Sequence, residues 1–313
     1  MSDRVVVFAP SPQLTVTVEQ VEGSPDVHVH AGGQGFWQSR MITALGSPVT
    51  LCCALGGESG TVLRHLMAGP NIEVRAREVS ARNGAYVHDR REGDREPLVE
   101  MAPDKLSRHE LDDLYELTVV AAIESGTAVL SGSADTATEE VVPVSVYERL
   151  TADLVRNGCR VVVDLAGARL ASALKATPTV VKIAHDECQE DGRAESAELP
   201  DLLAAAKDIA RGGVDLVVVS RAADPTIAVY GGNAVTVTAP ALDPVDTRGG
   251  GDSMTAGIAA AFAQGADIDT ALRLGAAAGA LNITRHGLGT GGGEAVRVLA
   301  DRVRIEPIGE KDS

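Results

Sequence analysis

Apolar and polar residues follow two different patterns along this chain. From residue 111 onward, short continuous apolar runs are separated by amphipathic stretches, whereas residues 14–21 and 27–30 alternate between apolar and polar. Continuous runs are typical of strands that are buried on both faces, and alternation is typical of strands with one face in water. The two patterns predict a buried, mostly parallel sheet and a separate small sheet.

The main sheet is predicted from strands that alternate with helices. Strands are expected at residues 5–8, 48–55, 127–130, 161–165, 179–183 and 216–220, followed by a hairpin of 226–230 and 234–237. Helical spacing of apolar residues is found at 36–45, 111–123, 144–156, 199–211 and 270–283, and after the glycines at 249–251. Such alternation indicates βαβ units and an α/β fold.

The small sheet is predicted from the alternating segments and from β-like pieces between residues 71 and 101, where Gly84 and Gly93 are turn signals. We assign residues 13–30 and 71–101 to this sheet. Residues 1–12, 31–70 and 102–313 are assigned to the core.

Charge and composition narrow the classes of function. The chain has 28 Lys and Arg residues against 44 Asp and Glu residues, a net charge of −16. Such an acidic chain is a poor candidate for binding nucleic acid or an anionic membrane. No apolar stretch approaches the ~18 residues of a membrane span, and the N-terminus lacks a signal-peptide run. The four cysteines have no zinc-ligand spacing, which favours reduced cysteines in a cytoplasmic protein.

The most informative segment is residues 246–257, DTRGGGDSMTAG. Three glycines directly before a helix let backbone N–H groups converge, and these groups and the helix dipole form an anion site. A carboxylate in the first turn would repel a bound anion, so Asp252 makes sense there if it accepts a proton beside a reacting phosphate. The alternative is structural: a glycine turn followed by an acidic residue that caps the helix.

This segment resembles the second signature of the PfkB, or ribokinase-like, carbohydrate kinase family, D-T-x-G-A-G-D, with Gly250 for the Ala. Residues 32–37 resemble the family's first signature, G-G-x-x-x-N, and residues 131–133 fall where sugar-phosphate members carry S-G-S. The resemblance covers nearly the whole chain and is closest to the 1-phosphofructokinase and tagatose-6-phosphate kinase branch. It implies a ribokinase-like three-layer α/β/α core with the small sheet as a lid.

The resemblance also implies a mechanism. ATP with Mg²⁺ would donate its γ-phosphate to a hydroxyl of a sugar, phosphosugar or related small polyol. Asp252 would be the general base, and the N–H groups of Gly249, Gly250 and Gly251 would stabilise the transferring group. The lid would exclude water, and its exposed edges make a homodimer through the lid plausible.

The family's site residues carry over as two sets. The implied ATP contacts are Lys182, Glu187, Ser220, Arg221, Thr247, Gly249, Gly251 and Asn282, with Glu187 also linked to Mg²⁺. The implied substrate contacts are Gln13, Gly32, Gly33, Gln34, Trp37, Arg82, Ser131 and Asp252.

Several of these positions depart from the family pattern. Gln34, Trp37 and Gln13 stand where the family carries Lys, Asn and Asp, respectively, whereas Arg82 keeps the phosphate-binding Arg of the phosphosugar branch. The nucleotide loop, residues 220–225, lacks both family glycines, and Ala184 replaces an Asn. We hypothesise that Arg248 or Arg221 compensates near the phosphates, and an unchanged KM for ATP after alanine substitution at both would refute it.

Two other functions remain open from the sequence alone. The lost Lys, Asn, Asp and loop glycines fit a catalytically weakened relative that binds a nucleotide or metabolite as a sensor. An unrelated nucleotide-binding α/β protein has less support, because no G-x-x-x-x-G-K-[ST] string occurs and no G-x-G-x-x-G follows the first strand.

Overall fold

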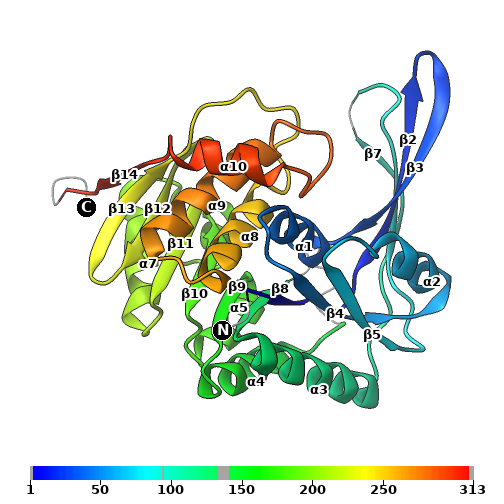
Figure 1. Cartoon of the computed structure of the whole chain (residues 1–313), viewed down its shortest axis with the longest axis horizontal. Coiled ribbons are helices and arrows are strands. Elements are labelled where there is room, and N and C mark those ends of the chain that lie inside the picture. The colour runs from blue at the N-terminus through cyan, green and yellow to red at the C-terminus, as the bar shows by residue number, and fades with distance from the viewer. Residues whose placement is uncertain (1–2, 94, 133–140, 310–313) are drawn as a thin grey trace.

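The computed structural model describes residues 3–93, 95–132 and 141–309, which form two sheets (Figure 1). The large sheet has ten strands, and the seven from β5 to β11 in sheet order are parallel. In that order its strands are β5 (Ile72–Glu78), β4 (Val49–Leu55), β1 (Val5–Phe8), β8 (Thr127–Ser131), β9 (Arg160–Asp164), β10 (Val180–Ala184), β11 (Leu216–Arg221), β12 (Asp224–Tyr230), β13 (Asn233–Thr238) and β14 (Arg304–Pro307). The predicted α/β class with a mostly parallel sheet is confirmed.

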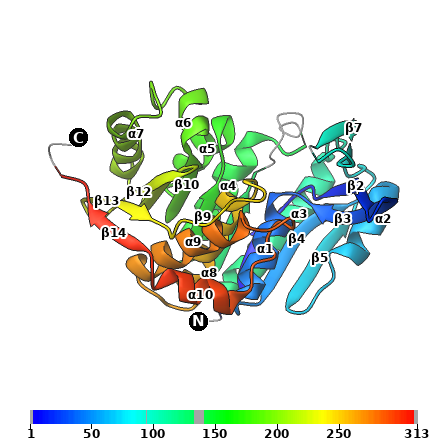
Figure 2. The ribbon, with the colours of Figure 1, turned by 90° about the horizontal axis from the view of Figure 1, so that it is seen from above.

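Helices cover both faces of this sheet, and each face has its own apolar core. Figure 2 shows α8, α9 and α10 on one side and α5, α6 and α7 on the other. The first core is built with α1 (Gln34–Ala44), α2 (Gly57–Leu66), α8 (Gly250–Ala263), α9 (Ile268–Asn282) and α10 (Gly293–Ala300). The second is built with α3 (Arg108–Ser125), α4 (Val144–Arg156), α5 (Gly167–Leu174), α6 (His185–Glu190) and α7 (Leu199–Arg211).

Strand residues feed the two cores alternately, so both faces of a strand must be apolar. In β1, Val5 and Val7 belong to one core and Val6 and Phe8 to the other. This is why these strands appear in the sequence as continuous apolar runs. The shorter α2, α5, α6, α10 and β14 were not predicted, because they carry too few residues for a clear period.

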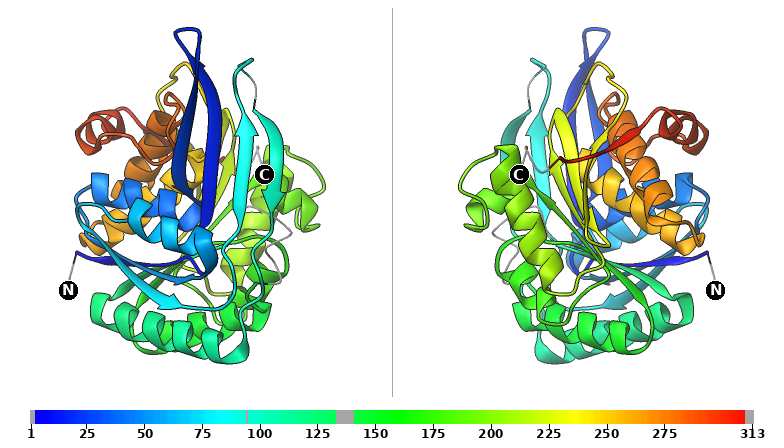
Figure 3. Two further views of the ribbon diagram at one scale, coloured as in Figure 1. Left: turned by 90° about the vertical axis from the view of Figure 1, so that its right-hand side faces the viewer. Right: turned by 90° about the vertical axis from the view of Figure 1, so that its left-hand side faces the viewer.

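The small sheet has the strand order β3-β2-β6-β7 and projects from one end of the molecule (Figure 3). Its strands are β2 (Gln13–Val21), β3 (Ser24–Gly32), β6 (Ala85–Asp89) and β7 (Glu96–Met101). We call this sheet the lid.

The predicted lid range of 71–101 was wrong at its beginning. β5 pairs with β4 in register from Val49↔Ile72 to Leu55↔Glu78 and is the edge strand of the large sheet. Its alternating sequence suits an edge position, because Ile72, Val74 and Ala76 pack on the core while Glu73 and Arg75 form a salt bridge at the surface.

The register of the lid separates its side chains by polarity. Thr15 pairs with His30 and Tyr86, and Thr17 pairs with His28 and His88, so these polar residues share one face. The opposite face is apolar and carries Val16, Val18, Val27, Val29, Val87 and Val99.

No helix in the described parts of the chain is both long and apolar enough to cross a membrane.

Close packing of α8 on α9 depends on glycines that face each other. A Cβ atom at Gly257 would lie 2.7 Å from Gly275 Cα, and one at Gly279 would lie 2.9 Å from the Gly250 carbonyl oxygen. The glycines of α9 therefore allow its close packing on α8.

Gly257→Ala is expected to lower the free energy of unfolding by about 1–3 kcal/mol, because the helices must separate to admit one methyl group. Chemical denaturation measures this change. Gly69→Ala is the matched control, since a Cβ at residue 69 meets nothing within 4 Å, and it should change stability by less than about 0.5 kcal/mol. Equal effects of the two substitutions would contradict the packing argument.

Candidate active site

The segment before α8 is held rigidly by the end of α9. The backbone N–H groups of Val245 and Asp246 donate to the Ile283 carbonyl at 2.7 and 3.0 Å. Gly249 takes a left-handed conformation with φ of 68° at the N-cap of α8, which favours glycine. The first N–H groups of α8 have no partner within their own helix, so this turn offers donors and the positive end of the helix dipole to an anion.

The Asn282 side chain stabilises this turn by two hydrogen bonds. Its side chain is fully buried, with Nδ2 donating to the Arg248 carbonyl at 2.8 Å and Oδ1 accepting from the Gly289 N–H at 2.8 Å. Both ends of the amide are therefore used inside the protein. Asn282 therefore holds the turn in place, and its predicted contact with ATP stays a prediction.

Asp252 lies in the first turn of α8 and is half-buried. Burial and the nearby Asp164 carboxyl raise its pKa to about 7, although Lys182 and a hydrogen bond from the Gln34 side chain oppose the rise. A carboxyl group with a pKa near neutrality can accept a proton from a hydroxyl and later release it. The role of Asp252 as general base stays a prediction.

Lys182 reaches the same turn from β10. Its ammonium group is buried and lies 3.2 Å from Asp164 Oδ1. Burial alone would lower its pKa, but the Asp164, Glu187 and Asp252 carboxyls raise the pKa well above its ordinary value. A Cβ atom at residue 251 would lie 2.6 Å from Lys182 Nζ. Glycine at 251 thus lets a fixed positive charge approach the N-terminus of α8.

Asp164 is a site residue that the sequence reasoning missed. Its Oδ2 accepts hydrogen bonds from Gln38 Nε2 at 2.9 Å and Thr255 Oγ1 at 2.8 Å. A signal was present in the sequence, since an acid ends the apolar run of β9 and the parallel register places it opposite Lys182.

Ser131 belongs to this buried network. Its hydroxyl donates to Gln38 Oε1 and the residue is fully buried, so it supports Gln38 and does not face a substrate as predicted. Ser133 of the same triplet lies outside the described residues.

A groove that is partly open to solvent lies beside the lid. Five predicted substrate residues line it, and Tyr147 and Arg169 are lining residues that were not predicted. The five are Gln13, Gly32, Gly33, Gln34 and Trp37. Gln34 connects this groove to Asp252 through its hydrogen bond.

Arg82 is not part of the groove lining. Its guanidinium binds both carboxylate oxygens of Asp104, at 2.9 and 3.1 Å. The predicted phosphate contact is therefore already paired within the protein.

The nucleotide side also differs from expectation. Residues 220–225 comprise the end of β11, a two-residue turn and the start of β12, with Ala222 at a φ of 49°. The Arg221 guanidinium points to the Ala197 carbonyl at 3.4 Å and the Asp224 carboxylate at 3.6 Å. Ser220 pairs with Ala184 in the sheet, and Thr247 is exposed beside the α8 turn.

Glu187 lies in the first turn of the short helix α6, where its Oε2 accepts the Ala184 N–H at 2.7 Å. Burial raises its pKa, and Lys182 opposes this. The described residues contain no cluster of three or more His, Cys, Asp or Glu side chains that could hold a metal alone. Glu187 fits Mg²⁺ in the way that ion is usually held, by one or two carboxylates together with substrate phosphates and water.

Comparison with known proteins agrees with this geometry. A family model described as pfkB family carbohydrate kinase matches residues 7–293. The chain is 30% identical over 261 residues to the ATP-dependent 6-phosphofructokinase isozyme 2 of Escherichia coli, covering 82% of each chain. It is 26% identical over 282 residues to the 1-phosphofructokinase of Borreliella burgdorferi, covering 89% of this chain and 88% of that one.

Solved structures show the same fold. The crystal structure of phosphofructokinase-2 from Escherichia coli in complex with potassium has a TM-score of 0.83 and 27% identity, and the match covers 96% of this chain and 98% of that one. The fold and the family match over most of the length lead to the same assignment. The glycine turn, with the buried Lys182–Asp164 pair beside it, is consistent with that assignment. The chain belongs to the pfkB family of carbohydrate kinases.

Proposed function

We propose that this carbohydrate kinase transfers the γ-phosphate of ATP to a sugar or phosphosugar hydroxyl bound in the groove beside the lid, with Asp252 as general base. The observation that carries this is the position of Asp252. It lies at a helix N-terminus, has a pKa raised to about 7, and lies near Gln34, which lines the groove.

The chemistry follows from these positions. Asp252 takes the proton of the acceptor hydroxyl, the oxygen attacks the γ-phosphorus, and the bond to the β–γ bridging oxygen breaks to release ADP. The N–H groups of Gly249, Gly250 and Gly251 and the Lys182 ammonium stabilise the charge on the transferring group. Each group is fixed before the substrate arrives, which lowers the cost of reorganisation.

Mg²⁺ would be held by Glu187 and the ATP phosphates, where it neutralises phosphate charge. Ser220 and Thr247 are the further residues that we expect to contact the nucleotide. ATP is the phosphate donor, and the four buried free cysteines suit the reducing cytoplasm where ATP is abundant.

The lid supports a dimer. Its apolar face leaves Val27 at 56%, Val29 at 44% and Val99 at 56% exposure, an unusual density of apolar side chains in one exposed sheet. We propose that a second copy of the chain covers this face. The polar face remains for the substrate.

We expect the chain to sediment as a dimer and Val27→Lys to sediment as a monomer at micromolar concentration, because a charge would be buried in the interface. Val62→Lys on α2, which replaces a valine that is 41% exposed, is the control and should remain dimeric. A monomeric wild type would refute the lid dimer.

The function is tested by ADP production with Mg-ATP across neutral sugars, sugar phosphates and polyols. Turnover of at least one sugar or phosphosugar is expected. No turnover of any acceptor, with ATP still raising the melting temperature, would instead favour a nucleotide-binding sensor.

A further inference from the structure

Asp164 joins four elements beside residues 246–252, which we call the catalytic turn. It is the last residue of β9, and its carboxylate contacts side chains from β10, α1 and α8. Figure 1 shows α8 beside α1, and α8 packs against both α1 and β9. The carboxylate therefore connects the helix that carries Asp252 to the helix that follows the glycines of the groove.

The two oxygens of this carboxylate have different partners. Oδ1 lies 3.2 Å from Lys182 Nζ, whereas Oδ2 accepts hydrogen bonds from Gln38 Nε2 at 2.9 Å and Thr255 Oγ1 at 2.8 Å. Asp164 is 2% exposed and both donor residues are fully buried, so water does not compete for these bonds. Two neutral donors on Oδ2 fix the plane of the carboxylate and leave Oδ1 to the lysine.

The Gln38 amide can take only one orientation in this network. Its Nε2 must face the Asp164 carboxylate, which only accepts hydrogen bonds, and its Oε1 accepts the Ser131 hydroxyl. Ser131 ends β8 and Asp164 ends the adjacent β9, so two strand ends hold the amide. Gln38 and Thr255 both lie outside the two family signature motifs, G-G-x-x-x-N and D-T-x-G-A-G-D.

The position of the lysine depends on this arrangement. A Cβ atom at residue 251 would lie 2.6 Å from Lys182 Nζ, so the ammonium lies against the first turn of α8. Without donors on Oδ2, the buried carboxylate would turn both oxygens toward the ammonium, because Lys182 is its other side-chain partner among the described residues. Such a rotation would move the positive charge relative to the N–H groups of the catalytic turn.

We propose that Gln38 and Thr255 are positioning residues, which orient the Asp164 carboxylate and through it hold the Lys182 ammonium at the catalytic turn. Neither side chain has to touch a substrate for this. The inference rests on the proposed kinase function, because there Lys182 acts on the transferring phosphoryl group. An interaction that strengthens as charge develops in the transition state affects kcat more than KM.

Thr255→Val and Thr255→Ser test the proposal together, since valine keeps the shape of threonine without the hydroxyl and serine keeps the hydroxyl without the methyl group. Thr255→Val should lower kcat about 10-fold, with the KM values for ATP and acceptor changed by less than about twofold. Thr255→Ser should keep kcat within about threefold of the wild type. A packing role predicts the reverse order, because serine leaves a cavity.

Thr118→Val on α3 is the matched control for Thr255→Val. Thr118 is fully buried, and its hydroxyl donates to the Leu114 carbonyl of its own helix at 2.8 Å. Thr255 has the corresponding contact within α8, to the Gly251 carbonyl at 3.1 Å, so the two threonines differ in the carboxylate contact. The control should leave kcat and both KM values within about twofold of the wild type.

Gln38→Met is the second, independent test. Methionine keeps nearly the length of the side chain but donates no hydrogen bond, and kcat should fall by a factor similar to that of the valine variant. Ser39→Ala is the control on the same helix, because Ser39 is fully buried and its Oγ donates to the Gly35 carbonyl at 2.7 Å. It should leave kcat within about twofold of the wild type.

The ¹⁵Nζ resonance of Lys182, identified by its loss in Lys182→Met, reports the ammonium without turnover. It should move in Thr255→Val and Gln38→Met and stay in place in Thr255→Ser and Thr118→Val. If the wild type phosphorylates no acceptor but the resonance follows this pattern, the positioning of Lys182 stands and the kinase function fails. A valine variant as active as the serine variant, or a resonance that moves in neither Thr255→Val nor Gln38→Met, overturns the proposal.

Discussion

Asp252→Asn is expected to reduce kcat by about 10²- to 10⁴-fold, the usual contribution of a positioned general base. The amide keeps the size of the side chain but cannot accept the hydroxyl proton. ATP affinity should be retained or improved, because one negative charge near the γ-phosphate is removed. Initial rates and nucleotide binding, measured on the same preparation, give both values.

The pH dependence of the wild type provides a second measurement of the same group. Since the pKa of Asp252 in the free enzyme is raised to about 7, kcat/KM should rise with pH through about 7 as the base ionises. The pKa of Asp252 in the folded state exceeds the ordinary aspartate value of 3.8, so the folded state keeps this proton to a higher pH than the unfolded state does. This carboxyl therefore reduces stability progressively between about pH 4 and 7. Above pH 7, Asp252→Asn should unfold at a temperature equal to or higher than that of the wild type.

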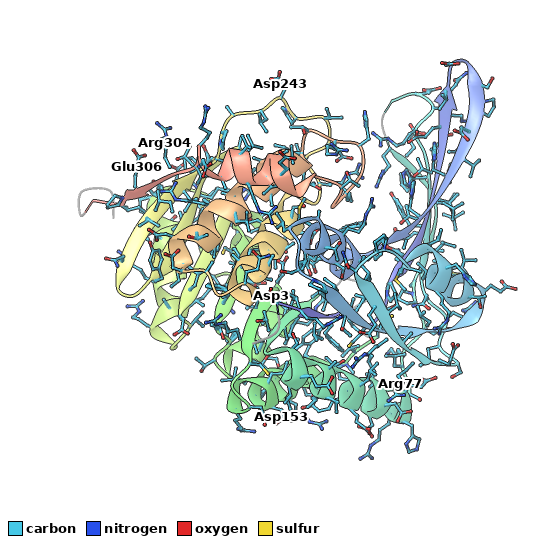
Figure 4. The ribbon with its side chains drawn as sticks, viewed as in Figure 1. Asp3, Arg77, Asp153, Asp243, Arg304 and Glu306 are labelled. Atoms are coloured by element: carbon cyan, nitrogen blue, oxygen red, sulfur yellow. The ribbon has the colours of Figure 1, made fainter. Side chains whose placement is uncertain are left out.

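Asp243→Asn is the control for this substitution. This substitution makes the same acid-to-amide change, but Asp243 is exposed in the segment that leads to the catalytic turn (Figure 4). It should alter kcat by less than about twofold, as expected for a surface change. An Asp252→Asn enzyme with nearly full activity, or a wild-type profile that is flat between pH 5 and 8, would remove Asp252 from the role of base.

The sequence was sufficient for the main sheet because each parallel strand feeds two cores and must be continuously apolar. The sequence was ambiguous for β5, because an edge strand of the large sheet and a strand of the lid can both show alternating apolar and polar residues. This pattern does not indicate which strand pairs with β5. Only the register, Val49↔Ile72 and onward, resolves the question.

Some residues of the candidate site could be predicted from the sequence, and others could not. The turn formed by Gly249, Gly250, Gly251 and Asp252 at the start of α8 could be predicted, because these residues are adjacent in the sequence. Asp164, Gln38 and Thr255 come from three different elements, and their joint role depends on contacts that no local spacing records. Likewise, a sequence motif does not show that the Arg82 side chain is paired with Asp104.

Lys182→Met is expected to lower the free energy of unfolding by about 3–5 kcal/mol, in addition to reducing activity. The substitution leaves Asp164, with a side chain only 1% exposed, without its positive partner. Gln38 and Thr255 still donate hydrogen bonds to it, but two neutral donors do not balance a buried charge. Urea denaturation near neutral pH measures the loss.

Two further variants separate the buried charge from the lost lysine packing. Lys175→Met breaks the Lys175–Glu148 pair, whose side chains are 65% and 42% exposed, and should cost less than about 1 kcal/mol because water screens both charges. Adding Asp164→Asn to Lys182→Met removes the unpaired charge and should restore part of the lost stability. If the double variant instead has a lower free energy of unfolding than Lys182→Met, removing the Asp164 charge gives no relief. The ion pair would then not be the contribution of Lys182, and its role next to Gly251 would be packing alone.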